Sequence, residues 1–249
     1  MRTDYDLVPQ LQALGLRLAF MDAADPATVY SSIDHGGRYA FGNQPTIAQW
    51  NLARLAEALL PLIDPDEAKA VATATELVRG FEGHYQRHWR SGLRAKLGLA
   101  AAPTTDGADA DVDRALGDDF VGLLVEHQVD YTNGFRALVT AATGDLDALA
   151  ELFPAATAYQ PWLDRWRARL GDGGPAAASS MRLRNPAFIA RNHRVEDALT
   201  AAIERMDFRP FETLLAILAR PFDDQPEHAP SMAPPPMAVQ RRHVTFCGT

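Results

Sequence analysis

Two histidines, His84 and His88, have the spacing of metal ligands in the stretch FEGHYQRHWR. On a helix, residues four apart place both imidazoles on one face, as zinc sites require. The glutamate of the H-E-x-x-H zinc signature is missing, because Tyr85 follows His84. The sequence therefore favours a surface or packed pair over a zinc site, and a metal hydrolase is the weaker alternative.

A second candidate for acid/base chemistry is Asp34-His35, which opens the stretch DHGGRYAFGNQP. No serine or cysteine lies in a nucleophile motif such as G-x-S-x-G, so a hydrolase is not favoured. Gly42 precedes an expected helix, but a phosphate-binding P-loop needs several glycines and a lysine there. We interpret Gly42 and Asn43 as turn residues, and Thr46 as a residue that sets the start of the next helix.

Cationic side chains gather in the stretch RLRNPAFIARNHR, which contains Arg182, Arg184, Arg191, His193 and Arg194. This charge is sufficient to hold a phosphate or an acidic peptide. Alternatively, the arginines anchor an irregular loop to carboxylates elsewhere in the chain. The second interpretation is slightly favoured.

The elements that must position these residues are helices, because apolar residues recur at helical spacing and no group of alternating β-branched segments appears. One helix is expected from Thr46 to about Ile63 and the next from the IDPDE turn towards Leu97. Residues 100–113 read as an exposed linker, and GDGGPAAASS at 171–180 reads as a flexible break. No linker separates two independent cores, so we expect one mainly α domain.

Composition excludes several functional classes. The chain has 249 residues, 47% of them hydrophobic, and a net charge of −8, which opposes binding to nucleic acid or anionic membranes. A single cysteine, Cys247, rules out an internal disulfide framework and is compatible with the reducing cytoplasm. No apolar run approaches the length of a membrane span.

A series of longer blocks is more specific than any single motif. In chain order they are FMDAADP, DHGGRYAFGNQPTIAQWNLARLAEALLPLI, DYTNGFRAL, MRLRNPAFIARNHRVEDAL, FRPFETLLAIL and the terminal TFCGT. Together they resemble the C-terminal half of the selenoprotein O (SelO) family, over roughly Ala19 to Thr249. The resemblance implies a protein-kinase-like fold of which this chain holds the helical C-lobe, with the N-lobe absent through a truncated or mis-started gene. Residues 1–18 would be a divergent remnant of the catalytic-loop and metal-motif region, and residues 19–249 the C-lobe with its Pro-rich tail.

The resemblance also implies an activity. Members of the family bind ATP in an inverted pose and transfer AMP to Ser, Thr or Tyr hydroxyls of proteins, a reaction that needs Mg²⁺ or Mn²⁺. The glycine-rich loop, the lysine and the nucleotide-binding arginines of the family precede the catalytic loop, before the point where this sequence starts. We therefore expect no ATP and no metal to be bound by this chain alone.

The family's catalytic stretch resembles MNTDN followed by DYGPFAFMDA, whereas this chain starts MRTDYDLVPQLQALGLRLAFMDA. In an ungapped register, Asp4 falls on the family's catalytic Asp, Tyr5 replaces the metal-binding Asn, and Leu14 replaces the metal-binding Asp. A second register aligns LGL at 14–16 and implies that the DYGP segment is deleted. In both registers the metal carboxylate is missing, and its loss typically costs several kcal/mol of transition-state stabilisation.

Redox control in the family pairs a Cys after the metal motif with a Cys or selenocysteine near the C-terminus. Here Tyr30 stands where the first Cys would be, so Cys247 is a candidate redox residue without an internal partner.

In a kinase-like layout DHGGRYAFGNQP lies in the activation-segment region. Its polar residues are predicted to be scaffolding that shapes the floor of an active site: Asp34, Arg38, Tyr39 and Asn43. The sequence thus predicts a fragment of a protein AMP-transferase that is inactive alone. The alternative is a non-catalytic module that binds a partner protein or a separately encoded N-lobe.

Overall fold

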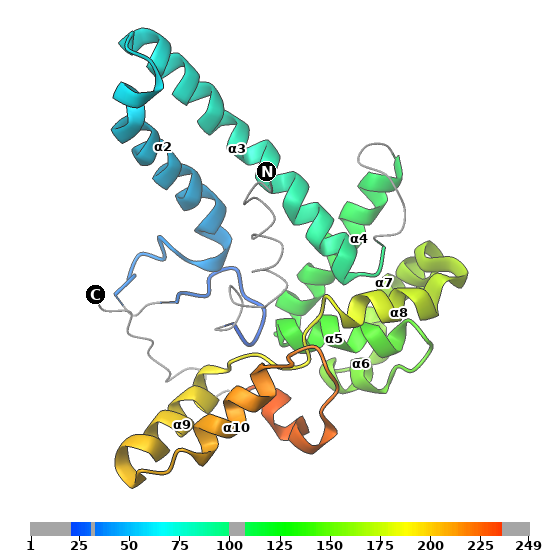
Figure 1. The fold of residues 1–249 in the computed structure, drawn as a ribbon. Coiled ribbons are helices and arrows are strands. Elements are labelled where there is room, and N and C mark those ends of the chain that lie inside the picture. The colour runs from blue at the N-terminus through cyan, green and yellow to red at the C-terminus, as the bar shows by residue number, and fades with distance from the viewer. Residues whose placement is uncertain (1–20, 31–32, 100–107, 236–249) are drawn as a thin grey trace. The chain divides into compact units, whose positions relative to one another are not determined.

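A computed structural model describes residues 21–30, 33–99 and 108–235, so the candidate residues Asp4 and Cys247 lie outside the described part. Within it the chain is mainly helical, as the sequence predicted, and residues Ala23 and Asp130 form one isolated antiparallel bridge (Figure 1). The elements are η2 (Phe41–Asn43), α2 (Gln44–Ile63), α3 (Glu67–Lys96), α4 (Ala108–Glu126), α5 (Tyr131–Ala141), α6 (Asp147–Leu152), α7 (Ala156–Leu170), η3 (Gly171–Gly173), α8 (Gly174–Arg182), α9 (Asn192–Arg205), α10 (Arg209–Leu218) and η4 (Pro226–Met232).

The described residues form two compact units. One contains residues 21–24 together with 91–235, and the other contains residues 25–90. The boundary falls within α3, which is continuous through it. The expected division into residues 1–18 and 19–249 stays a prediction, because its boundary lies outside the described residues.

In the smaller unit, α2 and α3 form a helical hairpin joined by residues 64–66 (Figure 1). The first helix begins at Gln44 with a proline in its first turn, two residues before the expected start at Thr46. A hydrogen bond from Gln49 Nε2 to the Val78 carbonyl, 3.1 Å long, joins the two helices. The apolar helix α2 nevertheless buries none of its side chains. No helix in the described ranges is both long and apolar enough to cross a bilayer.

Aromatic side chains spaced four residues apart form a ridge on α3. Phe81, Tyr85 and Trp89 stack in sequence with ring centroids 6.1 and 6.2 Å apart. Phe41 of η2 then contacts Trp89 at 6.5 Å. The ridge therefore connects α3 to the loop that precedes α2.

The core of the larger unit is built around α5, in which nine residues are buried. Phe135 of α5 meets Phe120 of α4 edge-on at 5.0 Å, and Phe120 stacks on Trp162 of α7 at 4.4 Å. The buried indole N–H groups are satisfied, because Trp162 donates to the Leu116 carbonyl and Trp166 to the Leu97 carbonyl, each at 2.9 Å. These bonds remove the cost of burying polar groups in the core.

The stretch 171–180, expected to be a flexible break, is instead η3 followed by most of α8. Pro175 lies in the first turn of α8, where its fixed φ favours a helix, and the alanines that follow are strong helix formers. Gly174 is buried so closely against the end of α5 that a Cβ there would lie 2.3 Å from the Ala142 carbonyl oxygen. Gly174 thus permits close packing, and the interpretation of this stretch as a flexible break, made from composition alone, was wrong.

The last helical pair, α9 and α10, packs together, and α9 buries Ala198 and Ala201. Ile217 of α10 lies in a small core with Ala187 and Phe188. Met206 ends α9 in the left-handed conformation, with φ of 52°. Six large apolar side chains of this pair and its connection stay exposed: Leu199, Ile203, Met206, Phe208, Phe211 and Leu215.

Candidate functional site

The loop that contains the predicted scaffold residues is held by the carboxylate of Asp34. The backbone N–H groups of Arg38 and Tyr39 each donate to it at 2.8 Å. Gly37, directly before Arg38, has a φ of 64°, a conformation that residues with a Cβ rarely adopt. Both oxygens of Asp34 are therefore used to fold the loop back on itself.

Asn43 closes the same loop at its other end. Its Nδ2 donates to the Gly37 carbonyl at 2.8 Å. The neighbouring Gly42 donates its N–H to the Pro26 carbonyl at 2.8 Å, and a Cβ at Gly42 would lie 3.1 Å from that oxygen. These hydrogen bonds hold the end of the loop, which directly precedes α2, against residues 26–28.

The side chains of Arg38 and Tyr39 lie on the outside of this loop. The Arg38 guanidinium lies over the Trp50 ring at 4.5 Å and within 5.8 Å of the Tyr39 ring. Both distances are in the range of cation–π attraction, which at exposed sites contributes about 0.5–1 kcal/mol. The structure therefore places Asp34, Arg38, Tyr39 and Asn43 in one self-supporting turn. Their expected place at the floor of an active site stays a prediction.

The histidine pair does not form part of a metal site in the described residues. His84 Nδ1 is 2.9 Å from a guanidinium nitrogen of Arg87 on the exposed surface of α3. No group of three or more His, Cys, Asp or Glu side chains in the described ranges could hold a metal ion. The expectation that this chain alone binds no ATP and no metal stays a prediction.

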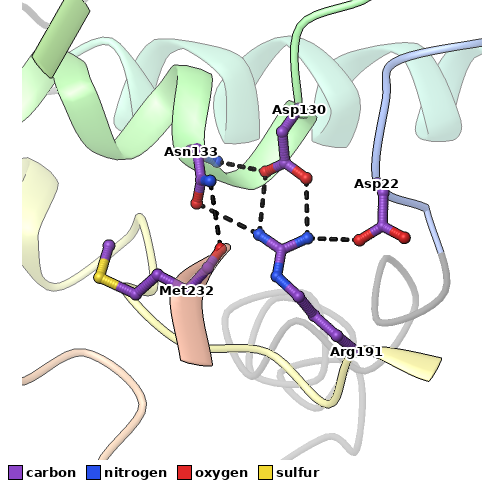
Figure 2. Close-up of polar contacts among 5 residues, drawn as sticks. All are labelled: Asp22, Asp130, Asn133, Arg191 and Met232. Carbon is purple, nitrogen blue, oxygen red and sulfur yellow. Dashed lines mark hydrogen bonds and ion pairs between the residues drawn. The ribbon is translucent and has the colours of Figure 1, made fainter. Parts of the chain in front are cut away.

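A buried charged cluster in the larger unit surrounds Arg191, whose side chain is only 1% exposed. Its guanidinium donates to Asp130 Oδ2 at 2.8 Å and to Asp130 Oδ1 at 3.2 Å (Figure 2). It also donates to Asp22 and, at 3.2 Å, to the side-chain oxygen of Asn133 (Figure 2). We call Asp22, Asp130, Asn133 and Arg191 the Arg191 cluster.

Local structure positions each member of the Arg191 cluster. Asp130 is the N-cap of α5 and accepts the N–H of Asn133 at 2.7 Å, while Arg191 immediately precedes α9. The segment containing Asp22 is held by two backbone hydrogen bonds, from Ala24 N–H to the Val129 carbonyl and from Tyr131 N–H to the Asp22 carbonyl, each 2.9 Å. The cluster thus fastens residues 22–24 to the start of α5 and to the start of α9.

Burial sets the electrostatics of the cluster. Desolvation raises the pKa of Asp22 above its ordinary value, although the adjacent Arg191 opposes this shift. Desolvation lowers the pKa of Arg191, but its hydrogen bond to Asp130 and the charges of Asp130 and Asp22 outweigh that effect and raise it. Arg191 therefore stays charged, and the carboxylates that face it are occupied as its partners. The arrangement is an anchor rather than a set of groups free for acid/base work.

This geometry decides between the two interpretations of the arginine-rich stretch in favour of anchoring. Arg191 pairs with Asp22 and Asp130, and Arg182 pairs with Asp224. Arg194 donates to the Pro230 carbonyl at 2.8 Å. Sequence reasoning singled out these arginines but missed their carboxylate partners. The available signal was that Asp22, Asp130 and Arg191 each lie in one of the quoted blocks.

The family model and the curated relatives that match this chain all indicate the same family. A family model described as protein adenylyltransferase SelO matches residues 17–219. A protein of Methylorubrum extorquens, named protein nucleotidyltransferase YdiU, is 51% identical over 242 residues, covering 93% of this chain and 47% of the relative. Proteins of the same name from Rhizobium rhizogenes and Chromobacterium violaceum are each 49% identical over 236 and 235 residues, with 93% of this chain and 45% and 48% of the relative covered. The chain spans about half the length of the curated relatives it matches.

Proposed function

The chain belongs to the SelO family of protein adenylyltransferases, and from this membership we propose that it is the C-terminal half of a protein nucleotidyltransferase. In the proposed reaction the oxygen of a Ser, Thr or Tyr hydroxyl bonds to the α-phosphorus of ATP. The bond from that phosphorus to the bridging oxygen breaks, pyrophosphate leaves, and the hydroxyl proton passes to a base. The observation that supports the proposal is 51% identity to a nucleotidyltransferase over 242 residues.

Within that protein we assign this chain the helical lobe of a kinase-like fold. The Arg191 cluster supports the assignment, because it fixes residues 22–24, directly after the region expected to hold the metal motif, to two helix starts. In this assignment the chain supplies structural support. The groups that bind ATP and Mg²⁺ or Mn²⁺ belong to the other half of the nucleotidyltransferase. The cytoplasm, favoured by the single cysteine, is the proposed location.

On this proposal the chain alone transfers no AMP. The replacements Tyr5 and Leu14, at positions where the family has metal-binding Asn and Asp, support this expectation. Without a carboxylate to hold the metal, the charge on the phosphates is left uncompensated in the transition state.

The test is incubation with α-labelled ATP, Mg²⁺ or Mn²⁺ and acceptor proteins, with the full-length Methylorubrum relative as positive control. We expect label on the acceptor only with the relative. Transfer by this chain that survives Asp4→Ala would mean that its catalytic group lies elsewhere in the sequence. Transfer abolished by Asp4→Ala would refute the claim of inactivity and assign catalysis to Asp4.

A non-catalytic interaction module is the second candidate function. The specific observation in its favour is the number of large apolar side chains left exposed on α2 and on the α9–α10 pair. Exposed patches of this kind often mark partner sites. Adding the unmatched half of the Methylorubrum relative tests this function: binding in a pull-down supports it, and a monodisperse monomer that captures no partner argues against it.

A further inference from the structure

The C-terminal end of the described chain returns to the Arg191 cluster. Asn133, a member of the cluster, donates from Nδ2 to the Met232 carbonyl at 3.2 Å (Figure 2). Arg194 of α9 donates to the Pro230 carbonyl at 2.8 Å. Both acceptors belong to η4, residues 226–232. We call residues 226–232 the strap, because they connect the end of the described chain back to the cluster.

The strap begins after a firmly held residue. Gln225 is buried, with 4% of its surface exposed, and its side chain donates to the Ile217 and Arg220 carbonyls at 3.1 and 3.0 Å. Shortly before it, the Phe222 carbonyl accepts from Arg136 at 3.2 Å. Movement of the strap therefore starts after Gln225 and leaves α10 in place.

Beyond Gln225 the packing is looser. The strap, all of which the structure describes, contains no buried residue. Met232 is only partly buried against the core that contains Ile217. An open pocket of about 430 Å³ lies beside the strap, lined by Ser231 together with residues of α9 and α10. Segments with little buried surface open at a lower free energy than a whole domain, so the strap is able to detach while the rest of the unit stays folded.

Asn133 connects the position of the strap to the geometry of the cluster. Its amide has one acceptor oxygen and one donor nitrogen. The oxygen accepts from Arg191 at 3.2 Å while the nitrogen donates to the Met232 carbonyl, so the docked strap holds the amide in the orientation that suits Arg191 (Figure 2). Without the strap the amide is free to turn its nitrogen toward the guanidinium, which has no acceptor for it. Strap docking therefore stabilises the cluster, and by linkage the intact cluster stabilises the docked strap.

Arg191 in turn holds residues 22–24. Its guanidinium donates to the carboxylate of Asp22, and the backbone carbonyl of Asp22 accepts the N–H of Tyr131 at 2.9 Å. The N–H of Ala24 donates to the Val129 carbonyl, also at 2.9 Å. The amides of Tyr131 and Ala24 are therefore protected from exchange with solvent while residues 22–24 stay in place, and their exchange rates report on that segment.

We propose that residues 226–232 are a detachable strap that controls the order of residues 22–24 through Asn133 and Arg191. Release of the strap loosens residues 22–24 without unfolding the helices around α5. Under the proposed function, residues 22–24 directly follow the region of the metal motif, so the strap lets the C-terminal end of the chain regulate that region. This consequence rests on the proposed function, whereas the coupling itself is measured without nucleotide transfer, so either can fail alone.

Amide hydrogen exchange of the full chain, resolved by residue with NMR, tests the coupling. Met232→Asp puts a carboxylate against an apolar core and should release the strap. We expect the N–H of His228, which donates to the Gln225 carbonyl, to exchange about tenfold faster. The N–H groups of Ala24 and Tyr131 should exchange about threefold faster or more, the size expected for the loss of one hydrogen bond, while the amides of α7 stay unchanged.

Two results overturn the proposal. Faster exchange at His228 with unchanged exchange at Ala24 and Tyr131 would show that the strap detaches without affecting residues 22–24. Unchanged exchange at His228 would show that Met232 does not hold the strap. Met232→Ala, which removes the packing without adding charge, should change the same amides in the same direction and serves if the aspartate variant does not fold.

Met206→Asp is the matched control, because Met206 is 75% exposed at the end of α9. It introduces the same charge into the same unit, away from the contacts of the strap. The exchange of His228, Ala24 and Tyr131 should be unchanged in this variant. Faster exchange at these amides would assign the effect of Met232→Asp to the added charge and overturn the proposal.

Asn133→Asp tests the route. The new carboxylate still accepts from Arg191, but it can no longer donate to the Met232 carbonyl. His228 should therefore exchange faster, while Ala24 and Tyr131 stay protected. Adding Met232→Asp to this variant should have no further effect on Ala24 and Tyr131, because the side chain at position 133 faces Arg191 without help from the strap. A further increase there would exclude Asn133 as the connection.

Discussion

Arg191 and Asp130 are joined by two hydrogen bonds, 2.8 and 3.2 Å long, from one guanidinium to one carboxylate that also caps α5. The same guanidinium reaches Asp22, 169 residues away in the chain. A single side chain thus connects the segment after the expected metal motif to the starts of two helices. Its burial determines how strongly the fold depends on it.

Replacing Arg191 with methionine should destabilise the protein by about 3–5 kcal/mol, because two carboxylates are then buried without a cation. Urea unfolding measures this as a fall in the free energy of unfolding. The matched control is Arg165→Met, which removes an exposed pair with Asp119, 2.8 Å long, and should cost less than about 1 kcal/mol. Equal losses in the two variants would show that the Arg191 cluster is not an anchor.

The sequence alone could predict the elements whose signals are local. The bounds of α3, its aromatic ridge and the end of α2 follow from helical spacing and from the IDPDE turn. The Arg191 cluster could not be predicted in this way, because the partners of Arg191 are 61 and 169 residues distant and no periodicity connects them. Composition also misled at 171–180, where Gly174 marks close packing against Ala142. Whether the apolar stripe on α2 is buried is a tertiary property, and helical spacing does not reveal it.

The loop around Asp34 provides a second prediction. Asp34→Ala removes the acceptor for the N–H groups of Arg38 and Tyr39, so these two amides should exchange with solvent about tenfold faster. Asp34→Asn keeps one acceptor oxygen and should give an intermediate rate. Hydrogen exchange followed by mass spectrometry or NMR measures the effect. Asp25→Ala, which removes a hydrogen bond to Ala27 N–H outside this loop, is the control and should leave the two amides protected.

Lys96 provides a prediction about pH. Its ammonium lies 5.0 Å from the Phe135 ring centre and 5.8 Å from that of Tyr131, and it donates to Asn185 Oδ1 at 3.4 Å. Burial lowers its pKa from 10.5 to about 8. Between pH 8 and 10.5 the unfolded chain therefore binds a proton that the folded chain lacks, so this group makes stability rise with pH in that window.

Lys96→Met should remove that rise. The urea midpoint of the wild-type chain, relative to the variant, is expected to increase from pH 8 to 10.5 and to stay constant from about pH 6 to 8. The lower window is the internal control, because Lys96 is then charged in both the folded and the unfolded state. A difference that stays flat through both windows would mean that Lys96 is solvated in the folded protein.

The glycines at the start of α8 give a matched pair of variants. Gly174→Ala places a methyl group 2.3 Å from the Ala142 carbonyl oxygen, which belongs to backbone and cannot rotate away. The contact should cost about 1–3 kcal/mol, as overpacking does elsewhere. Gly173→Ala adds the same group where nothing lies within 4 Å and φ is −76°, so it should be neutral or stabilise by about 0.4–1 kcal/mol through the unfolded state.

Thermal unfolding of the two variants beside the wild-type chain measures the contrast. If 171–180 is ordered against α5, the melting temperature falls for Gly174→Ala and is unchanged or higher for Gly173→Ala. A flexible segment would respond alike at both positions, because neither methyl group would meet a fixed neighbour. Two equal melting temperatures would therefore restore the flexible break that the glycine-rich composition first indicated.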